Sequence, residues 1–164
     1  MLYQNASGNR LRFWDDGDGT YTPYAGVTST LTENSSSPVT YTLTETSQDT
    51  YLFDANGLLL THTTPNNKTI SYSYNGSGQL TSVSADNGSS YLNLTYNGQG
   101  QVATASDFAN RSITFNYDAN GNLISQIDVL GQTWNYSYDS AHQLTEVVDP
   151  PEFLTWSKFL VIYE

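Results

Sequence analysis

The sequence predicts an all-β fold made of antiparallel β-hairpin repeats, about 21 residues each, stacked into a continuous twisted or spiralling sheet. An aromatic residue is followed by Gly-x-Leu, or a close variant, in five copies whose aromatic residues are 21, 22, 21 and 21 positions apart. Such a period indicates one supersecondary unit repeated side by side. The composition agrees, because 13 tyrosines and many Ser, Thr, Asn and Gly residues suit strands and turns, and only 13% of residues are charged.

The chain divides into three predicted parts. Residues 1–49 form an N-terminal β region, in which residues 28–32 and 39–44 alternate with period two around a turn-rich stretch. Residues 50–149 hold the five repeats. Residues 150–164 form an atypical tail.

The tail stops following the repeat. Phe159 lies 21 positions after Tyr138, but Trp156 is out of phase with it. Two interpretations stay open, a truncated or out-of-frame end and an alternative capping strand.

The first strand of each repeat carries aromatic or large apolar residues two positions apart. Residues i and i+2 share one face of a strand, so stacked units should align these side chains as ladders across the sheet. Mostly polar residues lie between them, which predicts one buried face and one solvated face. The predicted structural ladder consists of Tyr51, Phe53, Tyr72, Tyr74, Tyr96, Phe115, Tyr117, Tyr136 and Tyr138, with Leu94 preceding Tyr96.

A turn of the form Asp/Asn-x-x-Gly follows each aromatic strand. It suits a type I turn with glycine in the left-handed conformation, at Gly57, Gly78, Gly100 and Gly121. In the fifth copy His142 replaces glycine, which requires either a left-handed histidine or another geometry. At the other end of the unit, an aspartate such as Asp107 or Asp128 should accept backbone N–H groups of the return turn.

The second strand brings an apolar residue six positions after the key aromatic in every copy. Another apolar residue often follows at nine, although His62 and Gln126 take that place in two copies. Six and nine differ in parity, so a regular strand cannot place both on one face. Either a β-bulge restores the parity or the second residue packs in a different layer.

These features together resemble the YD repeats, also called RHS repeats. Residues 117–138 resemble the consensus along their whole length, residues 50–149 follow it, and Arg12–Tyr21 is similar to a segment that often precedes such repeats. The resemblance implies a large bacterial secreted or surface protein, related to insecticidal toxin complexes and teneurins, whose repeats wind into a sheet that can enclose a C-terminal toxin. The family's self-cleaving core has no match, because Asp149-Pro150-Pro151 occupies an ordinary turn position.

Charge and hydropathy exclude several classes of function. A net charge of −11 disfavours nucleic acid and anionic membranes, and no apolar run is long enough for a membrane helix. Residues 1–5 lack the features of a signal peptide. Either export uses another route or the chain is a piece of a longer polypeptide, and we favour the second.

The sequence offers no catalytic constellation. His62 and His142 are the two histidines, and neither sits in a recognisable motif beside a nucleophile. Asp16 and Asp18 are weak candidates for a calcium loop, because the acidic residue needed at its far end is missing. We expect no enzyme activity, no bound metal and no cofactor.

The predicted function is therefore a structural β-repeat scaffold, a segment of an extracellular or cell-surface protein that builds a shell, stalk or self-associating filament. Its partners would be other copies, through edge-to-edge β-pairing, or the rest of a longer RHS protein. The alternative is an adhesion module for glycans or a cell-surface partner, with exposed tyrosines and Trp134 stacking on sugar rings.

Overall fold

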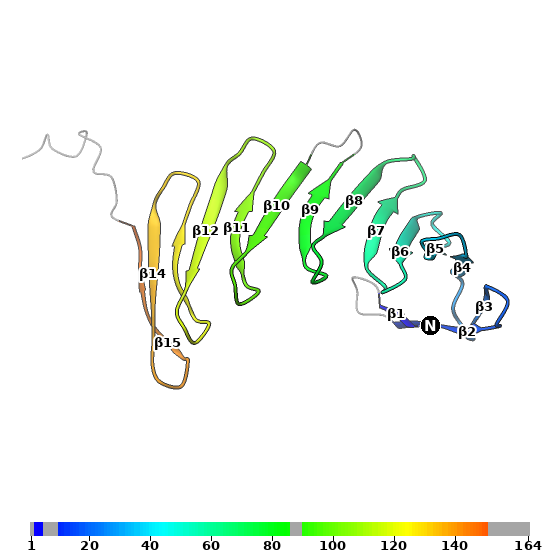
Figure 1. Cartoon of the computed structure of the whole chain (residues 1–164), viewed down its shortest axis with the longest axis horizontal. Coiled ribbons are helices and arrows are strands. Elements are labelled where there is room, and N and C mark those ends of the chain that lie inside the picture. Colours follow the sequence, from blue (N-terminus) through cyan, green and yellow to red (C-terminus); the bar gives the residue numbers. More distant parts are fainter. Residues whose placement is uncertain (1, 5–9, 86–89, 151–164) are drawn as a thin grey trace, which may run out of the picture. The chain divides into compact units, whose positions relative to one another are not determined.

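A computed structural model describes residues 2–4, 10–85 and 90–150. All regular structure in this part of the chain is β (Figure 1). The fifteen strands are β1 (Leu2–Gln4), β2 (Arg10–Asp15), β3 (Thr20–Pro23), β4 (Thr30–Asn34), β5 (Thr40–Thr44), β6 (Thr50–Asp54), β7 (Leu59–Thr63), β8 (Thr69–Tyr74), β9 (Leu80–Ser84), β10 (Ser90–Tyr96), β11 (Val102–Ser106), β12 (Ser112–Tyr117), β13 (Leu123–Ile127), β14 (Thr133–Tyr138) and β15 (Leu144–Val148).

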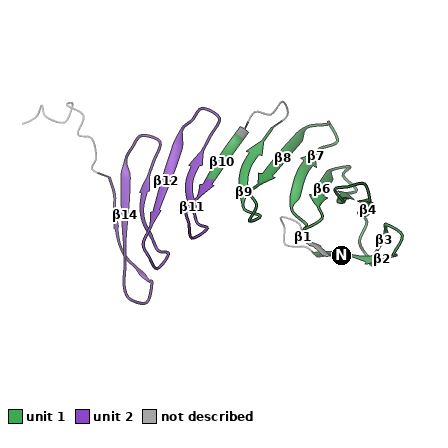
Figure 2. Ribbon diagram, in the orientation of Figure 1, with its two compact units in different colours: residues 1–94 green, residues 95–164 purple. Residues whose placement is uncertain are grey.

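The strands belong to two compact units, residues 1–94 and residues 95–164 (Figure 2). In the first unit the hydrogen-bonded order follows the chain from β1 to β10, and in the second it follows the chain from β11 to β15. The strand pairs with a determined register are all antiparallel, for example β6 with β7 and β13 with β14. The predicted all-β, antiparallel hairpin architecture is confirmed.

The best-buried side chains lie in the N-terminal β region of the first unit. Phe13, Leu31 and Leu43 are the buried apolar residues of the described chain, and Leu43 is completely inaccessible to solvent. They share one face, because Leu31 lies opposite Leu43 in the register of β4 and β5. Partly buried rings from the first repeat pack against this cluster, among them Tyr51 and Phe53. The cluster therefore anchors the first repeat to residues 1–49.

The repeats differ from the prediction in how deeply they bury their ladder. All nine ladder residues, from Tyr51 to Tyr138, are intermediate in exposure, and none is buried. The expectation of a fully buried face is wrong for the repeats, because the described part of the chain supplies no second layer that packs over the sheet. Each ring is shielded by its neighbours on the same face and leaves its outer side accessible.

A β-bulge restores the parity of the second strand. In β7 the register passes from Leu59 opposite Phe53 to Thr61 opposite Leu52, so Leu60 is the extra residue. The same shift occurs opposite Tyr74, Tyr117 and Tyr138. Apolar residues at positions six and nine therefore share the ladder face, for example Leu80 opposite Tyr74 and Val83 opposite Tyr72. Of the two explanations left open by the sequence, the bulge is the one observed.

Truncation of the buried core should cost far more than the same truncation at the last strand. We expect Leu43→Ala to lower the free energy of unfolding by about 2–5 kcal/mol, because it leaves a cavity in the cluster. Leu144→Ala is the matched control, since Leu144 is 53% exposed, and surface changes usually stay within about 0.5 kcal/mol. Urea denaturation of both variants measures the difference. Equal losses would contradict the assignment of the core to residues 1–49.

Candidate functional site

The candidate functional site is the set of contacts by which one repeat holds the next, and turns position it. Both ends of the hairpins use the same five-residue turn. In residues 54–58, Asp54 donates its backbone N–H to the carbonyl of Leu58, and Gly57 donates to the carbonyl of Asp54. The same pair of bonds recurs in residues 64–68, 75–79, 97–101, 107–111, 118–122, 128–132 and 139–143. These eight described turns, at both ends of the hairpins, therefore share one design.

A side-chain oxygen at the first position fixes most of these turns. In residues 118–122, Asp118 Oδ1 accepts N–H bonds from Asn120 and Asn122, both at 2.9 Å. The side chain of Asn122 also donates to this carboxylate, and together these bonds hold the pKa of Asp118 below its usual value. Asn75 makes the same two backbone bonds without a charge. The turn therefore needs an acceptor oxygen, and a carboxylate or an amide serves equally.

The predicted roles of the return-turn aspartates Asp107 and Asp128 are confirmed, and Asp86 lies outside the described residues. Asp107 Oδ1 accepts the N–H groups of Ala109 and Arg111, and Asp128 Oδ1 accepts those of Leu130 and Gln132. Arg111 also forms an ion pair with Asp107, and its hydrogen bond is the main reason why the pKa of Asp107 is lowered.

The fourth position of each turn has positive φ, between 57° and 87°. Glycine occupies it in four of the aromatic turns, with φ of 85° at Gly57, 76° at Gly78, 81° at Gly100 and 87° at Gly121. His142 adopts the left-handed conformation too, with φ of 61°. On the opposite edge Asn67, Asn110 and Gly131 take this position.

Two tyrosine hydroxyls tie their own repeat to the one before it. Tyr74 donates its hydroxyl to the carbonyl of Leu59 at 2.9 Å, and Tyr117 donates to the carbonyl of Val102 at 3.0 Å. Both acceptors lie 15 residues earlier, and Leu59 lies next to the bulge of β7. Burial raises the pKa of Tyr74, as expected for a phenol held against the sheet. In these two repeats the signature tyrosine therefore contributes a hydrogen bond between repeats as well as a ring.

Neighbouring turns on the aromatic-strand edge are also linked, at a separation of 20 residues. Gln101 Nε2 donates to the carbonyl of Gly121 at 2.9 Å, and the ring Nδ1 of His142 is hydrogen-bonded to Asn122 Oδ1 at 2.8 Å. In the first copy, Leu58 holds the place that Gln101 has in the turn of residues 97–101. There an open groove of about 770 Å³ lies between residues 54–60 and residues 72–78.

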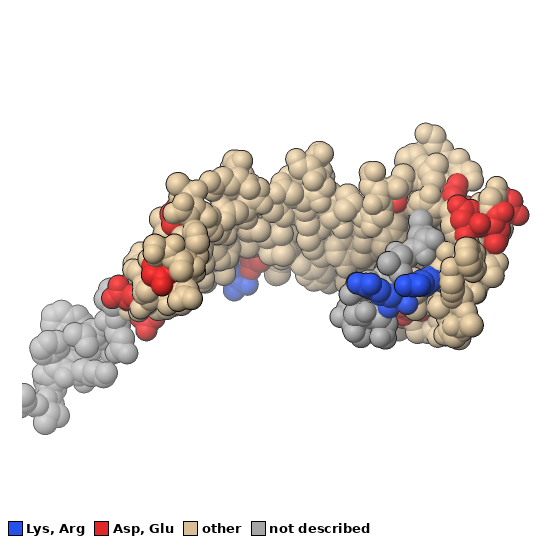
Figure 3. Space-filling model, turned by 90° about the horizontal axis from the view of Figure 1, so that it is seen from below, with Lys and Arg blue, Asp and Glu red and all other residues tan. Residues whose placement is uncertain are grey.

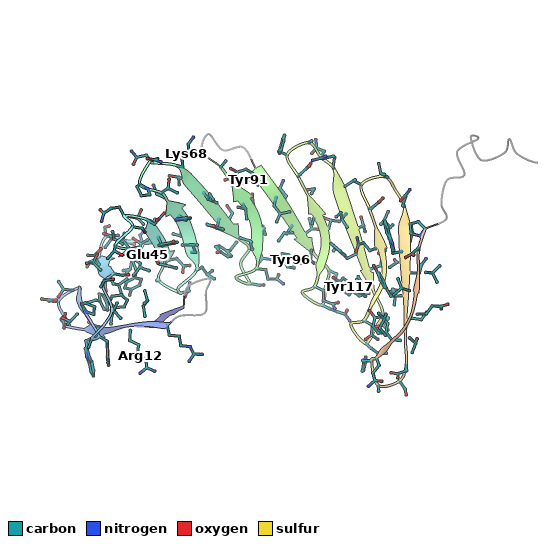
Figure 4. All side chains as sticks on the ribbon, turned by 180° about the vertical axis from the view of Figure 1, so that it is seen from behind. Arg12, Glu45, Lys68, Tyr91, Tyr96 and Tyr117 are labelled. Carbon is teal, nitrogen blue, oxygen red and sulfur yellow. The ribbon has the colours of Figure 1, made fainter. Side chains whose placement is uncertain are left out.

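The predicted ladder residues are brought together on one face in both units. In the first unit Tyr51 lies opposite His62 and Tyr72 opposite Val83. In the second, Tyr117 pairs with Leu123 and Tyr136 with Val147. The labelled Tyr96 and Tyr117 belong to this set (Figure 4). Trp134 lies opposite Gln126 and is half-buried.

The two histidines occupy structural positions. The ring of His62 stacks on Tyr51 with 4.5 Å between centroids and 2° between planes, and its Nε2 lies 3.0 Å from Asp49 Oδ1. Ser47 donates to the other oxygen of Asp49, and these two contacts lower the pKa of that carboxyl. His142 lies in the turn of residues 139–143, in the second unit.

The aspartates of the N-terminal turn are engaged by hydroxyl groups. Asp18 Oδ1 accepts the hydroxyl of Thr20, which lowers the pKa of Asp18, and Asp16 Oδ2 accepts the hydroxyls of Thr20 and Thr22. Among the described residues no cluster of three or more acidic, histidine or cysteine side chains could hold a metal ion. In that part of the chain there is also no helix able to span a membrane.

The geometry defines a class of protein, an array of β-hairpins joined by identical turns and by hydrogen bonds between repeats. The RHS repeat family model matches residues 53–90 and 117–150, so these two segments are RHS repeats. No curated protein matches the sequence.

Solved structures show a similar fold. A mutant Tc holotoxin pore of Photorhabdus luminescens superimposes with a TM-score of 0.51 and 18% identity, over 85% of this chain and 7% of that one. The crystal structure of TcdB2-TccC3-TEV has a TM-score of 0.45 and 15% identity, over 89% and 7%. This chain therefore spans only a small fraction of the length of the structures it matches.

Removal of one hydroxyl should weaken the contact between repeats. We expect Tyr117→Phe to lower the free energy of unfolding by about 0.5–1.5 kcal/mol, because the carbonyl of Val102 loses its donor while the ring remains. Tyr91→Phe is the matched control, since Tyr91 is 54% exposed. Urea denaturation compares the two variants. A loss for Tyr91→Phe as large as that for Tyr117→Phe would argue against the interrepeat role.

Alanine at the glycine positions should separate backbone strain from crowding. Gly57→Ala and Gly121→Ala both force alanine into the left-handed region, at a cost of about 1–2 kcal/mol. Gly121→Ala should cost more, because the new Cβ would lie 3.3 Å from Gln101 Nε2, whereas Gly57 has open space. Gly98→Ala is the control without positive φ or a neighbour within 4 Å. Thermal melting tests this order, and an inverted order would refute the link between turns.

Proposed function

We propose that this chain is a structural scaffold, a wall or stalk segment of a longer secreted or cell-surface bacterial RHS protein. Support comes from the interrepeat contacts, which use generic backbone acceptors and a ring-bearing strand, so that each repeat offers the next a similar docking edge. The similar fold within a Tc holotoxin component, of which this chain would cover 7%, favours a segment of a larger assembly.

The proposal assigns no catalytic role to the chain. The side chains that could act as bases, His62 and His142, lie in different units and face an aspartate and an asparagine. Within the described residues, these two contacts are not with a serine or threonine hydroxyl, the group that a histidine base would activate as a nucleophile. A scaffold needs no such group, and both histidines support packing and turn contacts instead.

The observation that carries the proposal is the state of the last described strand. All five residues of β15 are exposed, and Leu144 and Val147 are 53% and 48% accessible. Their equivalents in inner repeats, such as Leu80 and Val83, are partly buried. Within the described residues of the second unit, β15 pairs with β14 alone. Such an edge is suited to continuation of the sheet by another strand, from a longer chain or from a second copy.

Self-association at this edge is testable by a charge placed on it. We expect the wild-type chain to form higher species as concentration rises, and Val147→Lys to reduce them, because lysine blocks edge pairing. Val129→Lys is the matched control, since Val129 is 51% exposed but lies in a turn. Sedimentation velocity measures the association state, and the buffer should contain about 0.15 M salt because the salt screens repulsion between chains of net charge −11.

If the wild-type chain stays monomeric at all concentrations, the proposal that it self-associates into a filament is wrong. Association that Val129→Lys reduces as strongly as Val147→Lys would place the contact away from β15. Electron microscopy of the associated species distinguishes ordered filaments from amorphous aggregates.

A further inference from the structure

Strand β2 presents a distinct face that the scaffold does not use. Leu11 and Phe13 belong to the buried cluster of the first unit. Because side chains alternate along a strand, Arg10, Arg12 and Trp14 occupy the opposite face. Both arginines are exposed, and Trp14 is 59% exposed. Arg12 projects outward from β2 (Figure 4).

Trp14 is held as a flat platform. Its ring stacks on Tyr24 with 4.9 Å between centroids and 13° between planes. The backbone of Tyr24 is tied to β2, because its N–H donates to the carbonyl of Arg12 at 3.0 Å. The stack restrains the indole while more than half of the tryptophan stays open to solvent, an arrangement that preorganises an apolar surface for a flat ligand.

The two arginines are conspicuous in a chain with five basic and sixteen acidic residues. Positions i and i+2 of a strand place them about 6.8 Å apart along β2. The ion pairs of the described residues are His62–Asp49 and Arg111–Asp107, and neither involves Arg10 or Arg12. Figure 3 shows a group of basic side chains on the first unit, and the largest group of acidic side chains in this view lies further to the right.

Nearby acidic groups are turned to the hairpin loop. Asp16 accepts hydroxyl groups of Thr20 and Thr22, and Asp15 accepts the N–H of Gly17. Thr22 lies opposite Trp14 in the register, so the Asp16 carboxylate lies at the Trp14 end of this face. The positive end is at Arg10 and Arg12, which gives a ligand a defined orientation with its anionic group toward the arginines.

We propose that Arg10, Arg12 and the Trp14–Tyr24 stack bind an acidic oligosaccharide that contains uronic acid. The guanidinium groups would donate to a sugar carboxylate, and a pyranose ring would lie on the exposed face of Trp14. A nucleic acid is disfavoured by the net charge of −11. The exposed flat ring beside the charges favours a sugar over an acidic peptide. This binding is independent of the scaffold role, which uses the ladder face and β15.

Titration of the whole chain with tetragalacturonic acid tests the proposal. Binding should quench or shift the tryptophan fluorescence and weaken as salt rises. Arg10→Gln/Arg12→Gln should weaken binding about tenfold, in line with two exposed charge pairs. Trp14→Ala should also weaken binding, measured by isothermal titration calorimetry because this variant lacks the fluorescent reporter. Arg111→Gln is the matched control, because Arg111 is exposed and paired in the second unit. Circular dichroism confirms that each variant is folded.

Three results would overturn the proposal. The first is absence of saturable binding to the wild-type chain. The second is binding that the arginine and tryptophan variants leave unchanged. The third is equal affinity for a neutral tetrasaccharide or for poly-glutamate, which would indicate a general aromatic or anion surface. None of these results bears on association at β15, which is measured separately.

Discussion

The architecture depends on one short-range interaction, in which a side-chain oxygen at the start of a turn accepts two backbone N–H groups. At Asp118 and Asn75 the acceptor bonds to the residues two and four positions later. The interaction closes the turn locally and sets where the next strand begins. Because such turns recur at both edges, strand length stays nearly constant and equivalent residues of successive repeats come into contact. The hydrogen bonds and packing contacts between repeats depend on that regularity.

Local chemistry explains why the sequence was informative about the fold. The period, the left-handed positions such as Gly57 and His142, and the need for a bulge beside Leu60 all arise from residues within one hairpin. Such features depend on spacing along the chain, which the sequence displays directly. The acceptor role of Asp107 could be predicted for the same reason.

Contacts across repeats were harder to predict. The alternation of rings and polar residues shows that a face is apolar, but it does not show whether another layer covers that face. Tyr74 and its equivalents are therefore half-buried instead of buried. The hydroxyl contact of Tyr117 with Val102 could have been suspected, because tyrosine is preferred over phenylalanine in four of the five signatures. The exposed stack of Trp14 on Tyr24 left no periodic signal, since it belongs to the non-repeating region.

The hydroxyl contacts give the array a direction. Tyr74 and Tyr117 each reach back toward the preceding repeat, and neither reaches forward. The two ends of such an array are chemically unequal, much as the ends of a polar polymer are. The first copy carries Phe53 at this place, while Leu144 in β15, the last described strand, is the counterpart of the acceptors Leu59 and Val102. Elongation beyond β15 would then discriminate among incoming strands by a single oxygen atom.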